Sequence, residues 1–391
     1  MVICLAARRI WTHGLGGMET HCQSLAAELA RRRHVVHVVT TAHPSGRTDE
    51  LQLGARIHYL PATPAGDYSR AWWRASRRWA EDHLKALGVD AVISMSLAAR
   101  AIAAVPNAPP VFFIIHGYGW SQIRSFWHDS QGWRRLLEFP YHATQVVFRM
   151  VWSRPVLRRA AGVIAVSQEL CHQLRRFRAQ LVPNVVDTAV FRPDPGQRVR
   201  MRAALGISDD DVVALVVGTV NRQKGVDVAL DVCADLAMKT PALRVVVIGD
   251  GPALEPLGHW VRTQAPHLRV TFLGPQPNEA LPPYYAAADI FLFPSRRQEG
   301  LPTTVLEAMA SGLPVVATRS GGTPTAVRHG ETGLVTAIGD ARAFGLALRG
   351  LVGDPARRHA LGAAARRVAE EVFDVHAVVG RLVDLIRGAR C

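Results

Sequence analysis

The sequence contains few cysteines, and none of them form a closely spaced pair. The five are scattered, with no Cys-x-x-Cys motif: Cys4, Cys22, Cys171, Cys233 and Cys391. An odd, dispersed set excludes a disulfide framework and is typical of reduced thiols in a cytosol. We interpret Cys4, Cys22 and Cys233 as small buried hydrophobic residues.

Long apolar runs are also missing. Runs such as VVALVVG at 212–218 have the length of a strand. They fall well short of the ~18 apolar residues needed to cross a bilayer. The opening MVICLAARRIW turns basic too soon for a signal peptide. These observations predict a cytoplasmic location.

Acidic residues are outnumbered by basic ones. The chain has 46 Lys and Arg against 32 Asp and Glu, a net charge of +14 supplied mostly by arginine. Such a charge attracts nucleic acid, anionic lipid headgroups or phosphate-bearing substrates. No nucleic-acid-binding module is recognisable, so we expect no nucleic-acid partner. Hydrophobic residues at 49% and charged residues at 20% exclude a disordered chain.

Strand-like and helix-like segments alternate along the chain, which predicts an α/β fold with parallel sheets covered by helices on both faces. The strand-like segments of the first half are 2–7, 35–40, 90–94, 111–115 and 162–167. A helix is expected after the first of them, with one apolar face formed by Leu15, Met18, Cys22, Leu25, Ala26 and Leu29.

The pattern breaks at 187–198, where two prolines, a glycine and lost periodicity predict an interdomain linker. It restarts with a helix from about 224 and strand-like segments at 211–218, 244–249, 269–274, 289–294 and 314–318. Because 391 residues exceed one comfortable core, we expect two doubly wound, Rossmann-like domains facing a cleft. They span 1–190 and 191–370, and a helix in 371–391 crosses back to the first domain.

The most informative stretch is 299–317, EGLPTTVLEAMASGLPVVA. It follows a predicted strand, and ligands of open α/β sheets bind beyond the carboxyl ends of strands. A helix is expected to begin near Thr303, where the free amides of residues 302–305 form a seat for a diphosphate. Glu307 is placed to accept hydrogen bonds from ribose hydroxyls, and Glu299 to hold sugar hydroxyls. A solvated helix residue is the alternative for Glu307.

A second segment, 216–230, also follows a strand end. Gly218 opens a turn, and Lys224 lies at a helix start from which it reaches a phosphate. An ordinary surface lysine is the alternative.

Two segments of the first half are placed in the same way. In HGLGGMET (13–20), Gly14, Gly16 and Gly17 permit close approach to an anion, although the dinucleotide spacing is absent and a plain tight turn is the alternative. His116 directly follows an apolar strand and is expected to face the cleft, a structural histidine being the alternative.

Together these segments resemble the family 4 retaining glycosyltransferases, which have the GT-B fold. The resemblance spans nearly the whole chain, in the family's order, and its most specific part is the block from Glu299 through LEAMASGLPVVA. The motifs are GG at 16–17, HG at 116–117, VS at 166–167, VPN..D at 182–187, G.....KG at 218–225, GDGP at 249–252, FLG at 272–274 and E-x7-E at 299–307.

The resemblance implies an enzyme that transfers a sugar from a UDP- or GDP-linked donor, with no cofactor, to a glycan or lipid-linked acceptor. The implied context is cell-envelope, exopolysaccharide or glycolipid synthesis. The donor is expected on the C-terminal domain and the acceptor on the N-terminal one. Catalytic roles are implied for His116, Glu299 and Lys224. The implied donor-binding residues are Gly16, Gly17, Gly218, Thr219, Arg222, Gly249, Gly251, Gly300, Leu301, Thr303, Thr304 and Glu307.

The family's mechanism retains the anomeric configuration, and the departing β-phosphate acts as the base. Catalysis then rests on positioning and on stabilising the charge of the leaving group. No Asp-x-Asp pair follows a predicted strand, since Asp209–Asp211 lies on the approach to one. We therefore predict that no metal is required.

Two positions depart from the family pattern. Thr219 stands where members usually carry an arginine that supports Lys224, and Thr325 stands where glutamate is usual. A lost charge-assisted hydrogen bond costs roughly 1.5–3 kcal/mol, or about ten- to a hundredfold in affinity. Weakened or specialised donor binding is the expectation, with Arg222 as a substitute cation.

The first half also holds YSRAWWRASRRW (68–79) and basic, tryptophan-bearing segments around 120–160. Tryptophan with arginine on a helix favours a membrane interface or a lipid-phosphate acceptor. We therefore expect peripheral association with an anionic membrane surface, the alternative being a basic solvated face with buried tryptophans.

Four other functions are compatible with parts of this pattern. A sugar-nucleotide epimerase or phosphorylase shares the two-lobed fold and needs no separate acceptor. A catalytically impaired scaffold of the same fold is suggested by Thr219. A nicotinamide-dependent dehydrogenase lacks its glycine spacing here, and a nucleic-acid-binding protein lacks a module.

Overall fold

The computed structural model describes residues 1–14, 16–67, 69–119 and 134–389. The chain divides into two compact units. The first combines the N-terminal segment up to Trp120 with Ala143–Val185 and the segment beginning at Val375, and the second consists mainly of Val186–Asp374. Each unit is described by itself.

The described part of the first unit is built on one eight-stranded sheet, of order β3-β4-β2-β1-β5-β6-β7-β8. All neighbouring strands are parallel except β3 and β4. The strands are β1 Val2–Ala6, β2 Val35–Thr41, β3 Asp49–Gln52, β4 Ala55–Leu60, β5 Ala91–Met95, β6 Val111–Ile115, β7 Gly162–Ala165 and β8 Gln180–Leu181. The central strands β1, β5 and β6 are almost continuously buried because helices cover both faces of the sheet.

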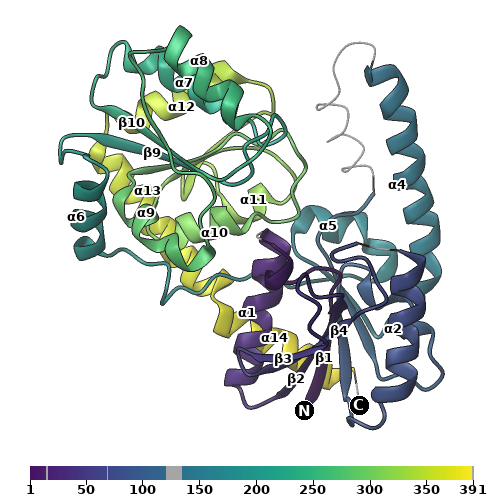
Figure 1. The fold of residues 1–391 in the computed structure, drawn as a ribbon. Coiled ribbons are helices and arrows are strands. Elements are labelled where there is room, and N and C mark those ends of the chain that lie inside the picture. The colour runs from purple at the N-terminus through teal and green to yellow at the C-terminus, as the bar shows by residue number, and fades with distance from the viewer. Residues whose placement is uncertain (15, 68, 120–133, 390–391) are drawn as a thin grey trace. The chain divides into compact units, whose positions relative to one another are not determined.

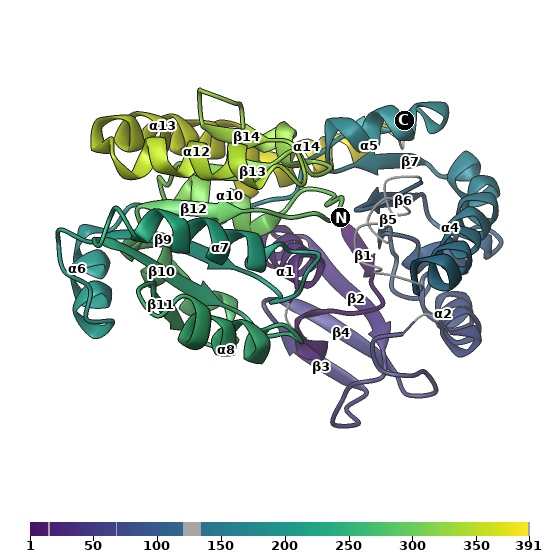
Figure 2. The same ribbon diagram turned by 90° about the horizontal axis from the view of Figure 1, so that it is seen from above.

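The helices of this unit are α1 Gly17–Arg31, α2 Arg70–His83, α5 Gln168–Gln173, α14 Val375–Gly388 and, from Ala143 onward, α4 Arg134–Arg159. Short 3₁₀ turns lie at η1 Trp11–His13, η2 Ala98–Arg100, η3 Ile102–Ala104 and η4 Arg175–Phe177. Helices α1 and α14 pack together, and α2 lies beside α4 (Figures 1 and 2). Glu28 of α1 links α1 to α14, because its Oε2 atom lies 2.8 Å from Nδ1 of His376.

The second unit is built on an all-parallel sheet of order β11-β10-β9-β12-β13-β14. Its strands are β9 Val212–Val217, β10 Leu243–Ile248, β11 Arg269–Phe272, β12 Ile290–Phe293, β13 Val315–Thr318 and β14 Gly333–Thr336. The helices are α6 Pro195–Ala204, α7 Val226–Ala237, α8 Leu254–Gln264, α9 Pro282–Ala287, α10 Thr303–Ala310, α11 Thr323–Ala326, α12 Ala341–Val352 and α13 Pro355–Val368, with η5 Asn278–Ala280 and the π-helical η6 Ala369–Phe373.

The buried core of this unit explains why these segments form a parallel sheet. Consecutive residues of the central strands are buried, Leu215 and Val245 completely, and Phe344 of α12 is 1% exposed. Branched apolar side chains of this kind favour strands that are covered on both faces. All predicted strands are present within a residue or two, so the α/β class with two parallel sheets is confirmed.

The predicted linker at 187–198 is partly wrong, because its last residues belong to a helix. Pro195 begins α6, and Asp194 accepts a hydrogen bond from the amide of Gln197 at 2.8 Å. Proline in the first turn and aspartate before it are ordinary helix-start signals. The loss of apolar periodicity hid them.

Candidate functional site

Within the second unit, the predicted glycines lie at the carboxyl edge of the sheet, where neighbouring loops touch backbone to backbone. Gly249 follows β10 with a φ of +139°, and a Cβ atom there would lie 1.9 Å from the carbonyl oxygen of Gly218. Gly225 has a φ of +71°, and its Cβ would lie 2.0 Å from the carbonyl oxygen of Pro294. Only glycine fits these contacts, which hold the loops after β9, β10 and β12 together.

Lys224 and Glu299 form an ion pair at this edge. The Nζ atom of Lys224 donates a hydrogen bond to Oε1 of Glu299 at 2.8 Å, and the two side chains are 25% and 15% exposed. The amide of Lys224 donates to Oδ1 of Asn221 at 2.9 Å. The hydroxyl of Ser295 donates to Glu299 at 3.3 Å. The structure therefore brings two of the three predicted catalytic residues into direct contact.

The charge of Glu299 is stabilised by its neighbours. Burial alone would raise the pKa of this carboxyl, but the charges of Lys224 and Arg297 and the hydrogen bonds from Lys224 and Ser295 hold the pKa below its usual value. Glu299 is thus an anion at neutral pH, close to a cation that is also available to a phosphate.

Helix α10 begins beside this pair, as predicted. Its N-cap is Pro302, which offers no side-chain cap and has no N–H, so residue 302 cannot belong to the predicted amide seat. The first-turn amides that remain are those of Thr303, Thr304 and Val305, which have no carbonyl partner within the helix. Gly300 and Leu301 lead into this turn, and Leu301 is buried. The positive end of the helix dipole lies at the same point.

Glu307 lies one turn into α10 and is buried rather than solvated. It is 3% exposed. The hydroxyl of Tyr285 donates to its Oε2 atom at 2.8 Å, and Nδ2 of Asn278 donates to Oε1 at 3.2 Å. Burial raises the pKa of Glu307 to about 7, and these two hydrogen bonds act in the opposite direction.

Thr219 and Arg222 lie in the loop after β9. The carbonyl of Thr219 accepts a hydrogen bond from the amide of Asn221 at 3.1 Å. Arg222 is exposed, and its carbonyl accepts from Arg296 at 2.7 Å. Arg296 is itself tied to Asp227 at 2.8 Å. Substitution by Arg222 for the family's usual arginine stays a prediction.

Gly251 follows β10 in the second unit with a φ of +156°, and a Cβ atom there would lie 2.4 Å from the carbonyl oxygen of Val220. The other predicted residues belong to the first unit. Gly17 begins α1 and Gly16 is its N-cap. A Cβ on Gly16 would lie 2.4 Å from the carboxylate of Glu19 in the same turn. His116 directly follows β6, and its Nε2 atom lies 2.9 Å from Nδ1 of His21, a buried residue of α1. His21 therefore links the glycine turn to His116.

The two histidines are both neutral at physiological pH. Burial lowers the pKa of His116 to about 4, and the backbone of Ile114 opposes this only in part. Burial, followed by the charge of His116, lowers the pKa of His21 well below its usual value. A neutral His116 is suited to a hydrogen bond with an uncharged hydroxyl.

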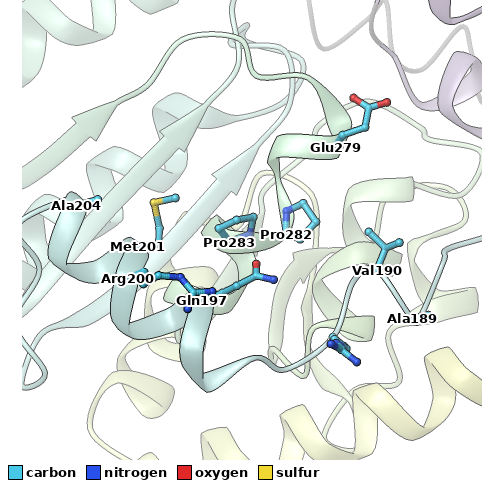
Figure 3. A pocket seen from close by; sticks show the side chains of 10 residues that line it. Ala189, Val190, Gln197, Arg200, Met201, Ala204, Glu279, Pro282 and Pro283 are labelled. Carbon is cyan, nitrogen blue, oxygen red and sulfur yellow. The ribbon is translucent and has the colours of Figure 1, made fainter.

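Two other features lie away from these residues. A cavity of about 630 Å³ is framed by α6, α9 and the segment before α6, and none of the predicted site residues line it (Figure 3). Asp211 lies at the start of β9, where Arg244 and Arg269 pair with it at 2.6 and 2.8 Å. Among the residues described, no group of three or more His, Cys, Asp or Glu is placed to hold a metal ion.

Three residues of the site escaped prediction from the sequence: His21, Asn278 and Tyr285. His21 lies among the buried residues of α1 but outside the predicted apolar face, and a histidine inside a helix is more often structural than functional. Tyr285 lies in the apolar run PPYYAA and Asn278 in a turn. No local signal in a single sequence distinguishes such residues.

Both units match families of known proteins. The protein-family model described as Glycosyltransferase Family 4 matches residues 15–190. The family model described as Glycosyl transferases group 1 matches residues 197–368. GDP-mannose-dependent alpha-(1-6)-phosphatidylinositol monomannoside mannosyltransferase of Mycolicibacterium smegmatis is 29% identical over 389 residues, covering 96% of each chain. D-inositol 3-phosphate glycosyltransferase of Nocardia farcinica is 31% identical over 281 residues, which are 65% of this chain and 62% of that one.

Solved structures show the same fold. Sucrose-phosphate synthase of Thermosynechococcus elongatus superposes with a TM-score of 0.81 at 23% identity, covering 99% of this chain and 98% of that one. This likeness confirms the fold class predicted from the sequence.

Proposed function

The chain belongs to the family 4 glycosyltransferases of the GT-B fold, and we propose that it transfers a hexosyl group from a nucleoside diphosphate sugar to an acceptor hydroxyl with retention of anomeric configuration. The observation that carries the proposal is the grouping, at one sheet edge of the second unit, of the Lys224–Glu299 pair, the N-terminus of α10 and Glu307. These groups suit the three parts of such a donor: Glu299 the sugar, Lys224 and the first-turn amides of α10 the diphosphate, and Glu307 the ribose.

The proposed chemistry is the one that the family resemblance implies. The acceptor hydroxyl oxygen forms a bond to the anomeric carbon while the bond from that carbon to the β-phosphate oxygen breaks. The hydroxyl proton passes to the departing β-phosphate. Lys224 and the first-turn amides of α10 stabilise the negative charge that grows on the diphosphate. Glu299 holds sugar hydroxyls. The role of His116 at the reactive face of the sugar stays a prediction.

The relatives suggest the substrates. GDP-mannose is our proposed donor and a phosphoinositol-bearing glycolipid our proposed acceptor, because the Mycolicibacterium relative is named for that donor and for a phosphatidylinositol mannoside. The relative from Nocardia is named for an inositol phosphate. Both names are consistent with the basic character of this chain.

Nucleotide binding tests the proposed function first. We expect GDP to raise the melting temperature more than UDP or ADP, because a ligand that binds only the folded state stabilises it. We further expect GDP-mannose to be consumed only when an acceptor lipid is present, giving an α-linked product by NMR, and EDTA to leave the rate unchanged. Turnover without acceptor would favour an epimerase, binding without turnover a scaffold, and loss with EDTA a metal requirement.

A surface on the first unit suits a lipid acceptor. In the described chain no helix is long and apolar enough to cross a membrane. Helix α4, however, exposes Val147, Phe148, Val151 and Trp152, with exposed fractions of 41, 55, 51 and 49%. Spacings of three and four residues put them on one face. The tryptophans Trp72 and Trp79 of α2 are buried instead, so α4 rather than 68–79 carries the exposed aromatic side chains.

Positive charge surrounds this apolar face of α4. The guanidinium of Arg100 lies 3.8 Å from the ring centroid of Trp152 and 5.7 Å from that of Trp73. Arg154 and Arg158 are exposed further along the helix. Apolar side chains flanked by arginine are typical of segments that bind an anionic lipid surface. We propose that α4 docks the enzyme on such a membrane.

Flotation with anionic liposomes tests this docking. We expect the double variant Phe148→Ser, Trp152→Ser to bind at least tenfold more weakly than wild type, because each aromatic side chain contributes roughly 1.5–3 kcal/mol when buried. Leu51→Ser is the matched control, since Leu51 is 74% exposed on β3 of the same unit. Equal flotation of all three proteins, or no flotation of wild type at low salt, would contradict the proposal.

A further inference from the structure

We propose that Tyr285, supported by Asn278, is a positioning residue that orients the carboxylate of Glu307 for the donor's ribose. This inference rests on the proposed function, because it assigns a partner to a group of the same site. Neither residue follows a strand end or belongs to the motifs that identified the site.

The two donors hold Glu307 from separate elements. Tyr285 belongs to α9 and reaches Oε2 at 2.8 Å, while Asn278 of η5 reaches Oε1 at 3.2 Å. The Tyr285 ring is itself fixed, being completely buried between Phe191 and Phe291, whose ring centroids lie 5.6 and 5.8 Å away. A carboxylate whose two oxygens each accept a hydrogen bond from a fixed donor is held in one orientation.

These two hydrogen bonds leave Glu307 able to bind a ligand. An ionised carboxylate has about four lone-pair positions, and the two hydrogen bonds occupy one on each oxygen. One position on each oxygen remains, which matches a vicinal diol that donates two hydrogen bonds. Asn278 is half-buried, whereas Tyr285 is completely buried. A ligand therefore reaches the carboxylate from the side of Asn278.

The same hydrogen bonds favour the ionised form of Glu307. A protonated carboxyl would lose acceptor capacity, and burial already raises the pKa of Glu307 to about 7. Tyr285 is the titratable group in contact with it among the described residues, and burial together with the Glu307 charge raises the pKa of Tyr285 well above its usual value. The phenol thus stays a donor, and removing it shifts the ionisation of Glu307 to higher pH.

The test measures GDP binding by calorimetry between pH 6 and 9 for the full chain. At pH 7.5 we expect Tyr285→Phe to weaken binding about tenfold, the effect of one hydrogen bond to a charged group. We expect the acidic limb of its pH profile to move up by about one pH unit. Asn278→Ala should move both quantities in the same direction, and its half-buried position makes misfolding less of a concern.

Tyr284→Phe is the matched control, because Tyr284 is partly exposed on the same helix. It should bind GDP as wild type does, whereas Glu307→Gln should lose binding at every pH. If Tyr285→Phe and Asn278→Ala bind like Tyr284→Phe with an unmoved acidic limb, the positioning role is wrong although the donor site stands. If wild type binds no nucleoside diphosphate, the proposed function itself is wrong.

Discussion

Replacing Lys224 with methionine is expected to lower kcat by about 10²–10³-fold, the typical effect of deleting one group that stabilises transition-state charge. Lys224 lies at the start of α7, and its ammonium is held 2.8 Å from Glu299. Of the arginines near this edge, Arg222 and Arg297 are exposed and Arg296 is paired with Asp227, whereas Lys224 is partly buried beside Glu299. Methionine keeps the aliphatic stem and removes the charge alone.

GDP binding should weaken as well, by about ten- to a hundredfold. Lys239→Met is the matched control, because Lys239 is an exposed lysine just beyond the end of the same helix. Steady-state rates with varied donor separate the two effects, and circular dichroism checks that both variants fold. If the Lys224→Met enzyme kept the wild-type kcat, the proposed catalytic role of the Lys224 charge would be wrong.

The strand pattern predicts most of this fold because the central strands are buried on both faces. Segment 212–217 is a continuous apolar run, and 243–248 is apolar apart from Arg244. The carboxyl ends of such strands mark where ligands bind. The hairpin of β3 and β4 was missed because its turn has no standard signal. Leu53 and Gly54 adopt φ values of +52° and +74° there, where asparagine and glycine are usual.

The site was predictable only as far as single motifs reach. Glu299 and Glu307 follow from their place around a helix start, and Lys224 from its place after β9. Their mutual contacts depend on the three-dimensional packing of separate loops. The pairing of Lys224 with Glu299 joins positions 75 residues apart, and that of His21 with His116 joins positions 95 apart. No spacing within one sequence encodes such distances.

Glu299→Gln is expected to separate donor binding from transfer. Glutamine has the shape of glutamate without its charge, so Lys224 loses its ion-pair partner and becomes fully available to the diphosphate. We expect GDP to bind at least as tightly as to wild type. Transfer should nevertheless fall by about a hundredfold or more, because the carboxylate that holds the sugar next to the reacting carbon is gone.

Opposite changes in kcat and in GDP affinity would identify Glu299 as a group that acts on the sugar rather than a structural partner of Lys224. A residue needed only to hold Lys224 in place would give weaker GDP binding when substituted. Glu255→Gln, at an exposed position of α8 in the same unit, controls for the loss of one negative charge. Calorimetry with GDP and single-turnover rates with GDP-mannose distinguish the outcomes. If Glu299→Gln lowered the transfer rate and the GDP affinity together, the ion pair would serve to position Lys224.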